Sequence, residues 1–128
     1  MKHEQKSVFG KGLRGLWVPV FPRGGAVYLS GQPSMDLVTS QFIDGTFEQQ
    51  FLKCFSNLDE ALEAAGLTRD DVVKCTVFLT DMRDFPAMNK LYAQQFQAPY
   101  PARSCFSVTG LPMGAKVEVE MIAHRGEQ

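Results

Sequence analysis

Short extended segments and two helical segments follow one another along this chain in the order ββαβαββ, and this order restricts the possible folds more than any other feature. The extended segments cover residues 16–21, 26–30, 72–80, 102–108 and 116–124. Each segment has an apolar side that must be buried against another layer. We therefore predict an α+β fold in which two helices lie on one face of a mixed sheet, and the length of 128 residues fits a single domain.

Both helices have recognisable ends. Thr46 and Gln49 are spaced as a capping box, apolar residues follow at intervals of three and four, and Gly66 is a natural stop. The second helix is predicted to begin with Asp84 as its cap and to end before Pro99. Its apolar stripe comprises Phe85, Met88, Tyr92 and Phe96.

The segment 72–80 is rich in β-branched residues and predicts a strand. One face is wholly apolar and comprises Val73, Cys75, Val77 and Leu79. The other face mixes Val72 and Phe78 with polar residues, which is more apolar than a water-facing side requires. This second face predicts a partner chain, and hence an oligomer.

Composition excludes several classes of function. Thirteen basic and 14 acidic residues give a net charge of -1, so nucleic acid is not an expected partner. No apolar run approaches the roughly 20 residues that span a bilayer, and the N-terminus lacks the apolar core of a signal peptide, so we expect a cytoplasmic protein without a membrane partner. Three cysteines without a CxxC pair predict free thiols. Two histidines near opposite ends give little support for a metal site or a Ser/Cys-His pair.

Two strands carry the candidate chemistry. In 102–108, Arg103 and Cys105 share a face, and in 116–124 Glu118 and Glu120 share a face. If these two strands pair, a guanidinium, a thiol and a carboxylate converge. The alternative is a structural Arg–Glu ion pair on a charged sheet face, which is the commoner arrangement in proteins.

Other candidates have simpler interpretations on pattern alone. Cys105 without a neighbouring histidine is more typical of a small buried residue than of a nucleophile. Asn89 either faces a pocket or lies on the solvent side of its helix, and the pattern alone favours the solvent side. Trp17 is either a structural anchor or a pocket wall.

The chain resembles the RidA/YjgF family over approximately residues 15–124. The matching pieces include SGQ at 30–32, VKCTVFL at 73–79, PARSC at 101–105 and VEVE at 117–120, together with Asn89, Tyr92 and Phe96. Each piece is weak alone, but their order and spacing are specific.

This resemblance implies a chorismate-mutase-like fold with a mixed six-stranded sheet and two helices on one face. It also implies a homotrimer with a central β-barrel and with ligand pockets between subunits. The implied activity is the cofactor-independent hydrolysis of 2-aminoacrylate-like enamines and their imine tautomers, the 2-imino acids, to 2-oxo acids and ammonia.

By the same resemblance, Arg103 holds the substrate carboxylate, Glu118 positions and deprotonates the attacking water, and Glu120 is structural. Two parallel guanidinium donors suit a carboxylate, and a partly desolvated carboxylate suits a general base. The residues expected to bind substrate are Trp17, Ser30, Gly31, Asn89 and Cys105.

One departure concerns Trp17, because it replaces the tyrosine of the family's usual Gly-Pro-Tyr segment. The expected substrate is therefore larger than 2-aminoacrylate or different from it. A competing hypothesis is a non-catalytic trimer that binds small carboxylates. A ribonuclease or translation inhibitor, a label often given to this family, is least supported because the chain lacks a basic aromatic patch.

Overall fold

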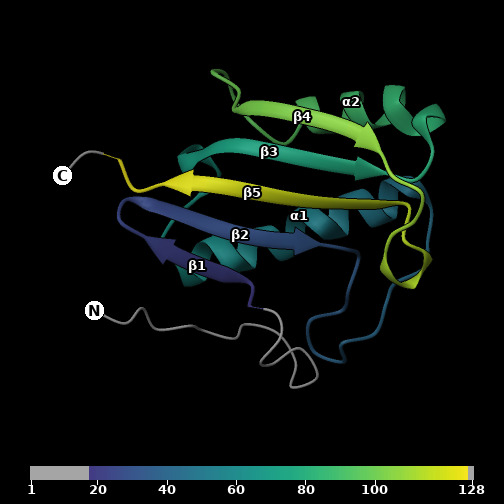
Figure 1. Cartoon of the computed structure of the whole chain (residues 1–128), viewed down its shortest axis with the longest axis horizontal. Coiled ribbons are helices and arrows are strands. Elements are labelled where there is room, and N and C mark those ends of the chain that lie inside the picture. Colours follow the sequence, from purple (N-terminus) through teal and green to yellow (C-terminus); the bar gives the residue numbers. More distant parts are fainter. Residues whose placement is uncertain (1–17, 127–128) are drawn as a thin grey trace.

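The computed structural model describes residues 18–126, which form one five-stranded sheet covered by two helices (Figure 1). The strands are β1 (Val20–Arg23), β2 (Ala26–Gln32), β3 (Val72–Leu79), β4 (Ala102–Ser107) and β5 (Val117–His124). The helices are α1 (Phe47–Ala64) and α2 (Phe85–Ala93), and short 3-10 turns cover Arg69–Asp71, Met82–Asp84 and Pro112–Gly114.

The strand order is β1-β2-β5-β3-β4, with β3 and β4 parallel and the other neighbours antiparallel. This confirms the predicted α+β fold with a mixed sheet. The expectation of six strands, which came from the resemblance, is wrong for the described residues, because their sheet contains five strands, as many as the extended segments that the sequence pattern indicates. Residues 33–45 are irregular apart from a single bridge between Met35 and Phe42.

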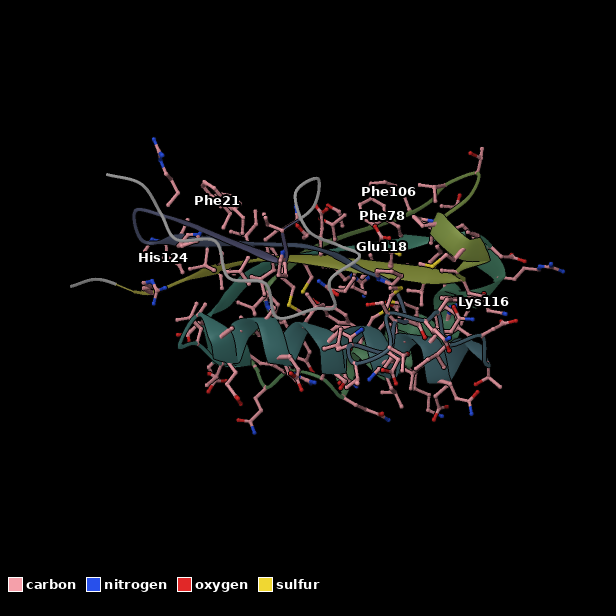
Figure 2. The ribbon with its side chains drawn as sticks, turned by 90° about the horizontal axis from the view of Figure 1, so that it is seen from below. Phe21, Phe78, Phe106, Lys116, Glu118 and His124 are labelled. Carbon is pink, nitrogen blue, oxygen red and sulfur yellow. The ribbon has the colours of Figure 1, made fainter. Side chains whose placement is uncertain are left out.

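Both helices lie on the same face of the sheet, as Figure 2 shows in a view along the sheet. The core between the layers is built from three aromatic rings of the helices and from alternate residues of the strands. Its members include Phe51, Phe55, Tyr92, Val77, Leu79, Val117, Val119 and Met121. Among the described residues, no helix is both long and apolar enough to cross a membrane.

The capping box of α1 forms as predicted. The Thr46 hydroxyl accepts a hydrogen bond from the Gln49 backbone N–H at 3.1 Å, and the Gln49 side-chain oxygen accepts from the Thr46 N–H at 2.8 Å. Gly66 follows the helix with a φ of 76°, a left-handed conformation that glycine adopts without strain. The start and the end of α1 are thus set by local residues.

The start of α2 differs from the prediction in detail. Asp84 occupies the cap position, but its side chain makes no capping hydrogen bond. Asp81 caps instead, because its carboxylate accepts from the Arg83 backbone N–H at the start of the preceding 3-10 turn. That turn continues directly into α2, so the residue that caps this helical segment lies three positions before the predicted cap.

Val73 is a second correction. It was expected in the buried face of β3, but its side chain is half exposed, whereas Val72 is buried. The pairing of β3 with β5 shifts register between Val72 and Lys74, which breaks the alternation of faces at that point. From Cys75 onward the predicted alternation holds.

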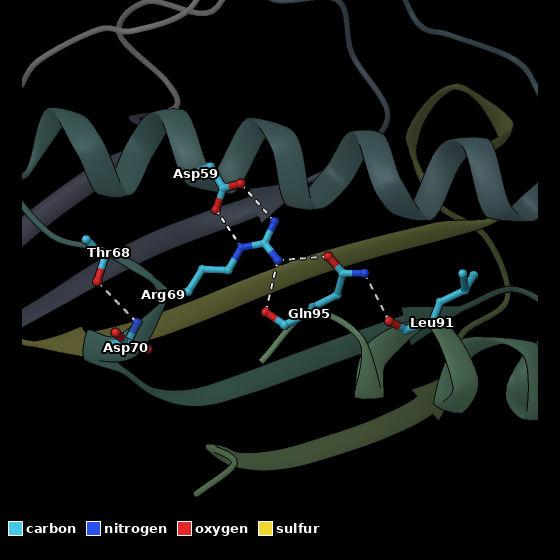
Figure 3. A network of polar contacts seen from close by, with 6 residues as sticks. All are labelled: Asp59, Thr68, Arg69, Asp70, Leu91 and Gln95. Atoms are coloured by element: carbon cyan, nitrogen blue, oxygen red, sulfur yellow. Dashed lines mark hydrogen bonds and ion pairs between the residues drawn. The ribbon is translucent and has the colours of Figure 1, made fainter. Parts of the chain in front are cut away.

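Arg69 ties the end of α2 to α1 (Figure 3). Its guanidinium donates two hydrogen bonds to the Asp59 carboxylate, at 2.7 and 2.8 Å, and its third nitrogen donates to the backbone and side-chain oxygens of Gln95. The Gln95 amide in turn donates to the Leu91 carbonyl. A cation that satisfies carbonyls at a helix C-terminus stabilises that end. Hollows of ≈ 410 and ≈ 210 Å³ flank Arg69 and include neither Arg103 nor Glu118.

The sheet face opposite the helices carries apolar side chains from all five strands. They include Phe21, Tyr28, Phe78, Phe106 and Ile122. Tyr28 and Phe106 are about half exposed, at 48% and 47%, and the Phe78 and Phe106 rings meet edge to face at 5.3 Å. Figure 2 shows Phe21, Phe78 and Phe106 on the side away from the helices. We call this surface the open face.

Candidate active site

Arg103 and Glu118 lie on opposite faces of the sheet. The strands that carry them do not pair, because β3 lies between β4 and β5. Arg103 is in register with buried Cys75 and so faces the helices, whereas Glu118 is in register with Phe78 on the open face. The predicted convergence of guanidinium, thiol and carboxylate is therefore wrong within one chain, and so is the alternative of an Arg103–Glu118 ion pair.

The Arg103 guanidinium lies against four side chains of α2. Its Nη1 donates to the Asn89 side-chain oxygen at 2.7 Å and lies 3.9 Å from the Met88 sulfur. Its Cζ lies over the Tyr92 ring at 4.9 Å from the centroid, and over the more distant Phe85 ring at 5.8 Å. Both rings are within the range of a cation–π interaction. The guanidinium is thus oriented by neutral groups only.

No carboxylate within residues 18–126 forms an ion pair with Arg103, although its side chain is half buried. Nη1 has partners, and the edge formed by Nε and Nη2 has none among the described residues. A half-buried cation without a counter-ion is costly, and this edge presents two parallel donors with the spacing of carboxylate oxygens. The arrangement suits a small carboxylate ligand.

The helix pattern alone favours the solvent side for Asn89, and this prediction is wrong, whereas the role in substrate binding that the resemblance implies stays a prediction. Asn89 lies one turn after Phe85 and one turn before Tyr92, at the margin of the apolar stripe, and it is half buried against Arg103. Phe85 and Tyr92 had been assigned only to packing. The spacing of 85, 89 and 92 on one helix face is the signal that could have placed all three beside the arginine.

Cys105 shares the face of Arg103, as predicted, and its side chain is partly buried against the core. Burial raises the pKa of the Cys105 thiol, while the nearby Arg103 charge acts in the opposite direction to a smaller extent. A raised pKa keeps the thiol protonated at neutral pH, and a thiol is a poor nucleophile. Cys105 can therefore contribute shape and a weakly polar surface to the site.

Glu118 packs against the backbone of β2 at Gly31. Burial raises the pKa of the Glu118 carboxyl, and the Glu120 charge raises it further. A Cβ atom at Gly31 would lie 2.5 Å from a Glu118 carboxylate oxygen, so the glycine leaves the space that this carboxylate occupies. Here β2 is irregular, because its register with β5 shifts between Leu29 and Gln32. The structure thus brings two predicted site residues together.

Replacing Gly31 with alanine should displace the Glu118 carboxylate. With Glu118 in the general-base role that the resemblance implies, the catalytic rate should fall about tenfold or more, since positioning of a general base is sensitive to shifts of about 1 Å. Because only a side-chain end must move, the midpoint of urea denaturation should change little. Gly25→Ala is the matched control, since its Cβ would displace only the His124 ring, at 2.7 Å. Equal rates for the two variants would contradict this role of Gly31.

The remaining predicted site residues are distributed as follows. The Ser30 hydroxyl donates to the Val18 carbonyl, so it fixes the chain entering β1. Trp17 lies outside the described residues. Within residues 18–126, no cluster of three or more histidine, cysteine, aspartate or glutamate side chains is placed to hold a metal ion. The three cysteines are free thiols, as predicted.

Fold and site together define a small α+β protein with an oriented arginine on the helix face and a desolvated glutamate on the open face. The family model described as Endoribonuclease L-PSP matches residues 13–125. The chain belongs to this family, the RidA/YjgF family.

Relatives of known sequence and structure agree with this assignment. The chain is 42% identical to the 2-iminobutanoate/2-iminopropanoate deaminase of the goat Capra hircus, over 78% of this chain and 73% of the goat protein. It is 33% identical to RidA from an Antarctic Psychrobacter, with a TM-score of 0.86 over 96% of this chain and 99% of that one. The E. coli protein TdcF, solved with bound serine, is 35% identical, with a TM-score of 0.87 over 98% and 100% of the two chains.

Proposed function

We propose that this protein hydrolyses 2-imino acids and their enamine tautomers to 2-oxo acids and ammonia in the cytosol. The observation that carries the proposal is the half-buried Arg103 guanidinium, which is oriented by Asn89 and Tyr92 and has no carboxylate partner among the described residues. Relatives about 40% identical are named 2-iminobutanoate/2-iminopropanoate deaminase, and serine, which is bound by TdcF, carries a carboxylate of the size this site suits.

The active site is proposed to form between subunits of a homotrimer, because Arg103 and Glu118 of one chain face apart. Two observations support association. The open face exposes aromatic rings around Glu118, and β4, which carries Arg103, is an edge strand. In the proposed trimer, the open faces surround a central barrel, and Glu118 of one subunit meets Arg103 of its neighbour.

In the proposed mechanism, the Arg103 guanidinium binds the substrate carboxylate and fixes the imine carbon beside a water molecule. Glu118 accepts a proton from this water as its oxygen bonds to the imine carbon, and the imine nitrogen takes a proton from solvent. Protonated Glu118 then donates its proton to the amino nitrogen of the tetrahedral intermediate, and the C–N bond breaks to release ammonia. The hydroxyl group loses its proton to solvent as the carbonyl of the 2-oxo acid forms, and Glu118 is again a carboxylate. An enamine substrate first tautomerises to the imine.

An ammonia-release assay tests this function. Purified protein is incubated with 2-imino acids of increasing side-chain length, generated in situ by an amino-acid oxidase, and the rate above spontaneous hydrolysis is measured. Longer side chains than that of 2-aminoacrylate should react best, since Trp17 replaces the family's tyrosine. Carboxylate binding without accelerated hydrolysis would overturn the proposal in favour of a non-catalytic binding protein.

A further inference from the structure

We propose that Tyr92 is the positioning residue of the carboxylate clamp: its ring fixes the plane of the Arg103 guanidinium so that the Nε–Nη2 edge is directed to the ligand. This inference rests on the proposed function, since it assigns a role in binding the substrate carboxylate. The contact of the Arg103 guanidinium with the Tyr92 ring can also be measured without any substrate.

The contact between the two residues is close and well defined. The Arg103 Cζ lies 4.9 Å from the centroid of the Tyr92 ring, closer than the 5.8 Å to Phe85. Nη1 is fixed separately by the 2.7 Å hydrogen bond to Asn89. A ring contact restricts the plane of the guanidinium, and a hydrogen bond at one nitrogen restricts its rotation. Together they leave one edge free, with a defined direction.

The Tyr92 ring is itself immobilised. It is 5% exposed and packs against Phe96 at 5.3 Å and edge to face against Phe55 at 6.3 Å. The residues just after α2 are held by the hydrogen bonds between Arg69 and Gln95 (Figure 3). The ring is thus a rigid support, which keeps the ordering cost of ligand binding low.

The Tyr92 hydroxyl is not the part that acts. It is buried near the Cys75 thiol, a weak hydrogen-bonding group, and makes no conventional hydrogen bond with a described residue. Phenylalanine would keep the ring and lose nothing that the clamp requires. This allows the ring and the hydroxyl to be separated experimentally.

The test compares Tyr92→Leu, which removes the ring, with Tyr92→Phe, which keeps it. Phe96→Leu is the control for loss of aromatic packing, since Phe96 belongs to the same cluster but does not contact Arg103. Binding of 2-oxobutanoate is measured by calorimetry, and kcat and KM are measured in the ammonia-release assay. The NMR resonance of the Arg103 Nε–H group is assigned by its loss in Arg103→Lys. Its chemical shift includes the ring-current effect of the nearby Tyr92 ring.

Tyr92→Leu is expected to raise the Kd for 2-oxobutanoate and the KM roughly tenfold, with a smaller change in kcat, as loss of a partly desolvated cation–π contact would. The Nε–H resonance should lose its ring-current shift. Tyr92→Phe should restore wild-type affinity and shift, and Phe96→Leu should preserve both despite a lower midpoint of denaturation.

Unchanged affinity and an unchanged Nε–H shift in Tyr92→Leu would overturn the role of Tyr92, as would equal loss of affinity in Phe96→Leu. If the wild-type protein does not bind 2-oxobutanoate, the proposed function fails, and the resonance alone decides whether Tyr92 orients Arg103. The two failures are therefore distinguishable.

Discussion

Replacing Arg103 with alanine should lower kcat/KM for carboxylated imines by about 10²–10³-fold. The reason is that removing one partner of a desolvated charge pair, here the guanidinium that binds the substrate carboxylate, costs several kcal/mol of binding free energy. Both carboxylate oxygens of the substrate would lose their hydrogen-bond donors, and the imine carbon would no longer be fixed beside the water. The rate is measured as ammonia released above spontaneous hydrolysis.

Arg103→Lys is the sharper comparison, since lysine keeps the charge but not the two parallel donors or the planar group that packs on Tyr92. We expect it to be nearly as impaired as the alanine variant. An imine without a carboxylate should react equally slowly with all three proteins. If lysine supports wild-type turnover, Arg103 contributes charge alone and the assigned clamp is wrong.

Replacing Glu118 with glutamine should lower kcat by about 10²–10⁴-fold, the usual contribution of general acid–base catalysis, and should leave KM nearly unchanged. Glutamine fills the same space beside Gly31 but cannot accept a proton from water at neutral pH. Glu120→Gln is the matched control, since Glu120 is exposed and should not contact the substrate. A comparable loss of kcat in the Glu120 variant would contradict the assignment of the base.

The pH profile follows from the direction of the pKa shift. A base acts only when deprotonated, so kcat/KM should fall as pH decreases through the raised pKa of Glu118, at a higher pH than for an ordinary glutamate. The Glu120 charge contributes to that rise. Glu120→Gln should therefore move the acidic limb of the profile to lower pH.

The same shift predicts that the Glu118→Gln variant folds well. Between the unfolded and the raised folded pKa of Glu118, the folded state binds more protons than the unfolded state, so the free energy of unfolding falls as pH rises. At neutral pH the carboxylate is therefore a destabilising group. Glutamine removes that effect, and the midpoint of urea denaturation should be equal to that of the wild type or higher.

Local features of this fold were predictable from sequence. The capping box between Thr46 and Gln49 involves residues three apart, and its hydrogen bonds form as the pattern predicts. The second half of β3 alternates as expected. Val73 was misplaced because a register shift depends on the partner strand β5, about 50 residues further along the chain, which the local pattern does not contain.

The strand faces of the candidate residues were predictable from sequence, but the arrangement of the strands was not. Period-two alternation correctly placed Arg103 and Cys105 on one face of their strand. The resemblance named Asn89, but its contact with Arg103 is seen only in the structure. The alternation does not reveal that β3 separates β4 from β5. Strand order depends on contacts between distant segments, and it decides that Arg103 faces the helices while Glu118 faces away.

The proposed active site requires Arg103 and Glu118 to come from different subunits, and co-refolding two inactive variants tests this directly. Each proposed site takes Arg103 from one chain and Glu118 from its neighbour. When Arg103→Ala and Glu118→Gln chains are mixed in equal amounts, each of these two residues is native in about half of the sites. Both are therefore native in about a quarter of the sites. The mixed oligomers should therefore recover about a quarter of the wild-type activity per site, whereas each variant alone stays inactive. Mixed oligomers that form but release no more ammonia than the separate variants would contradict a site shared between subunits.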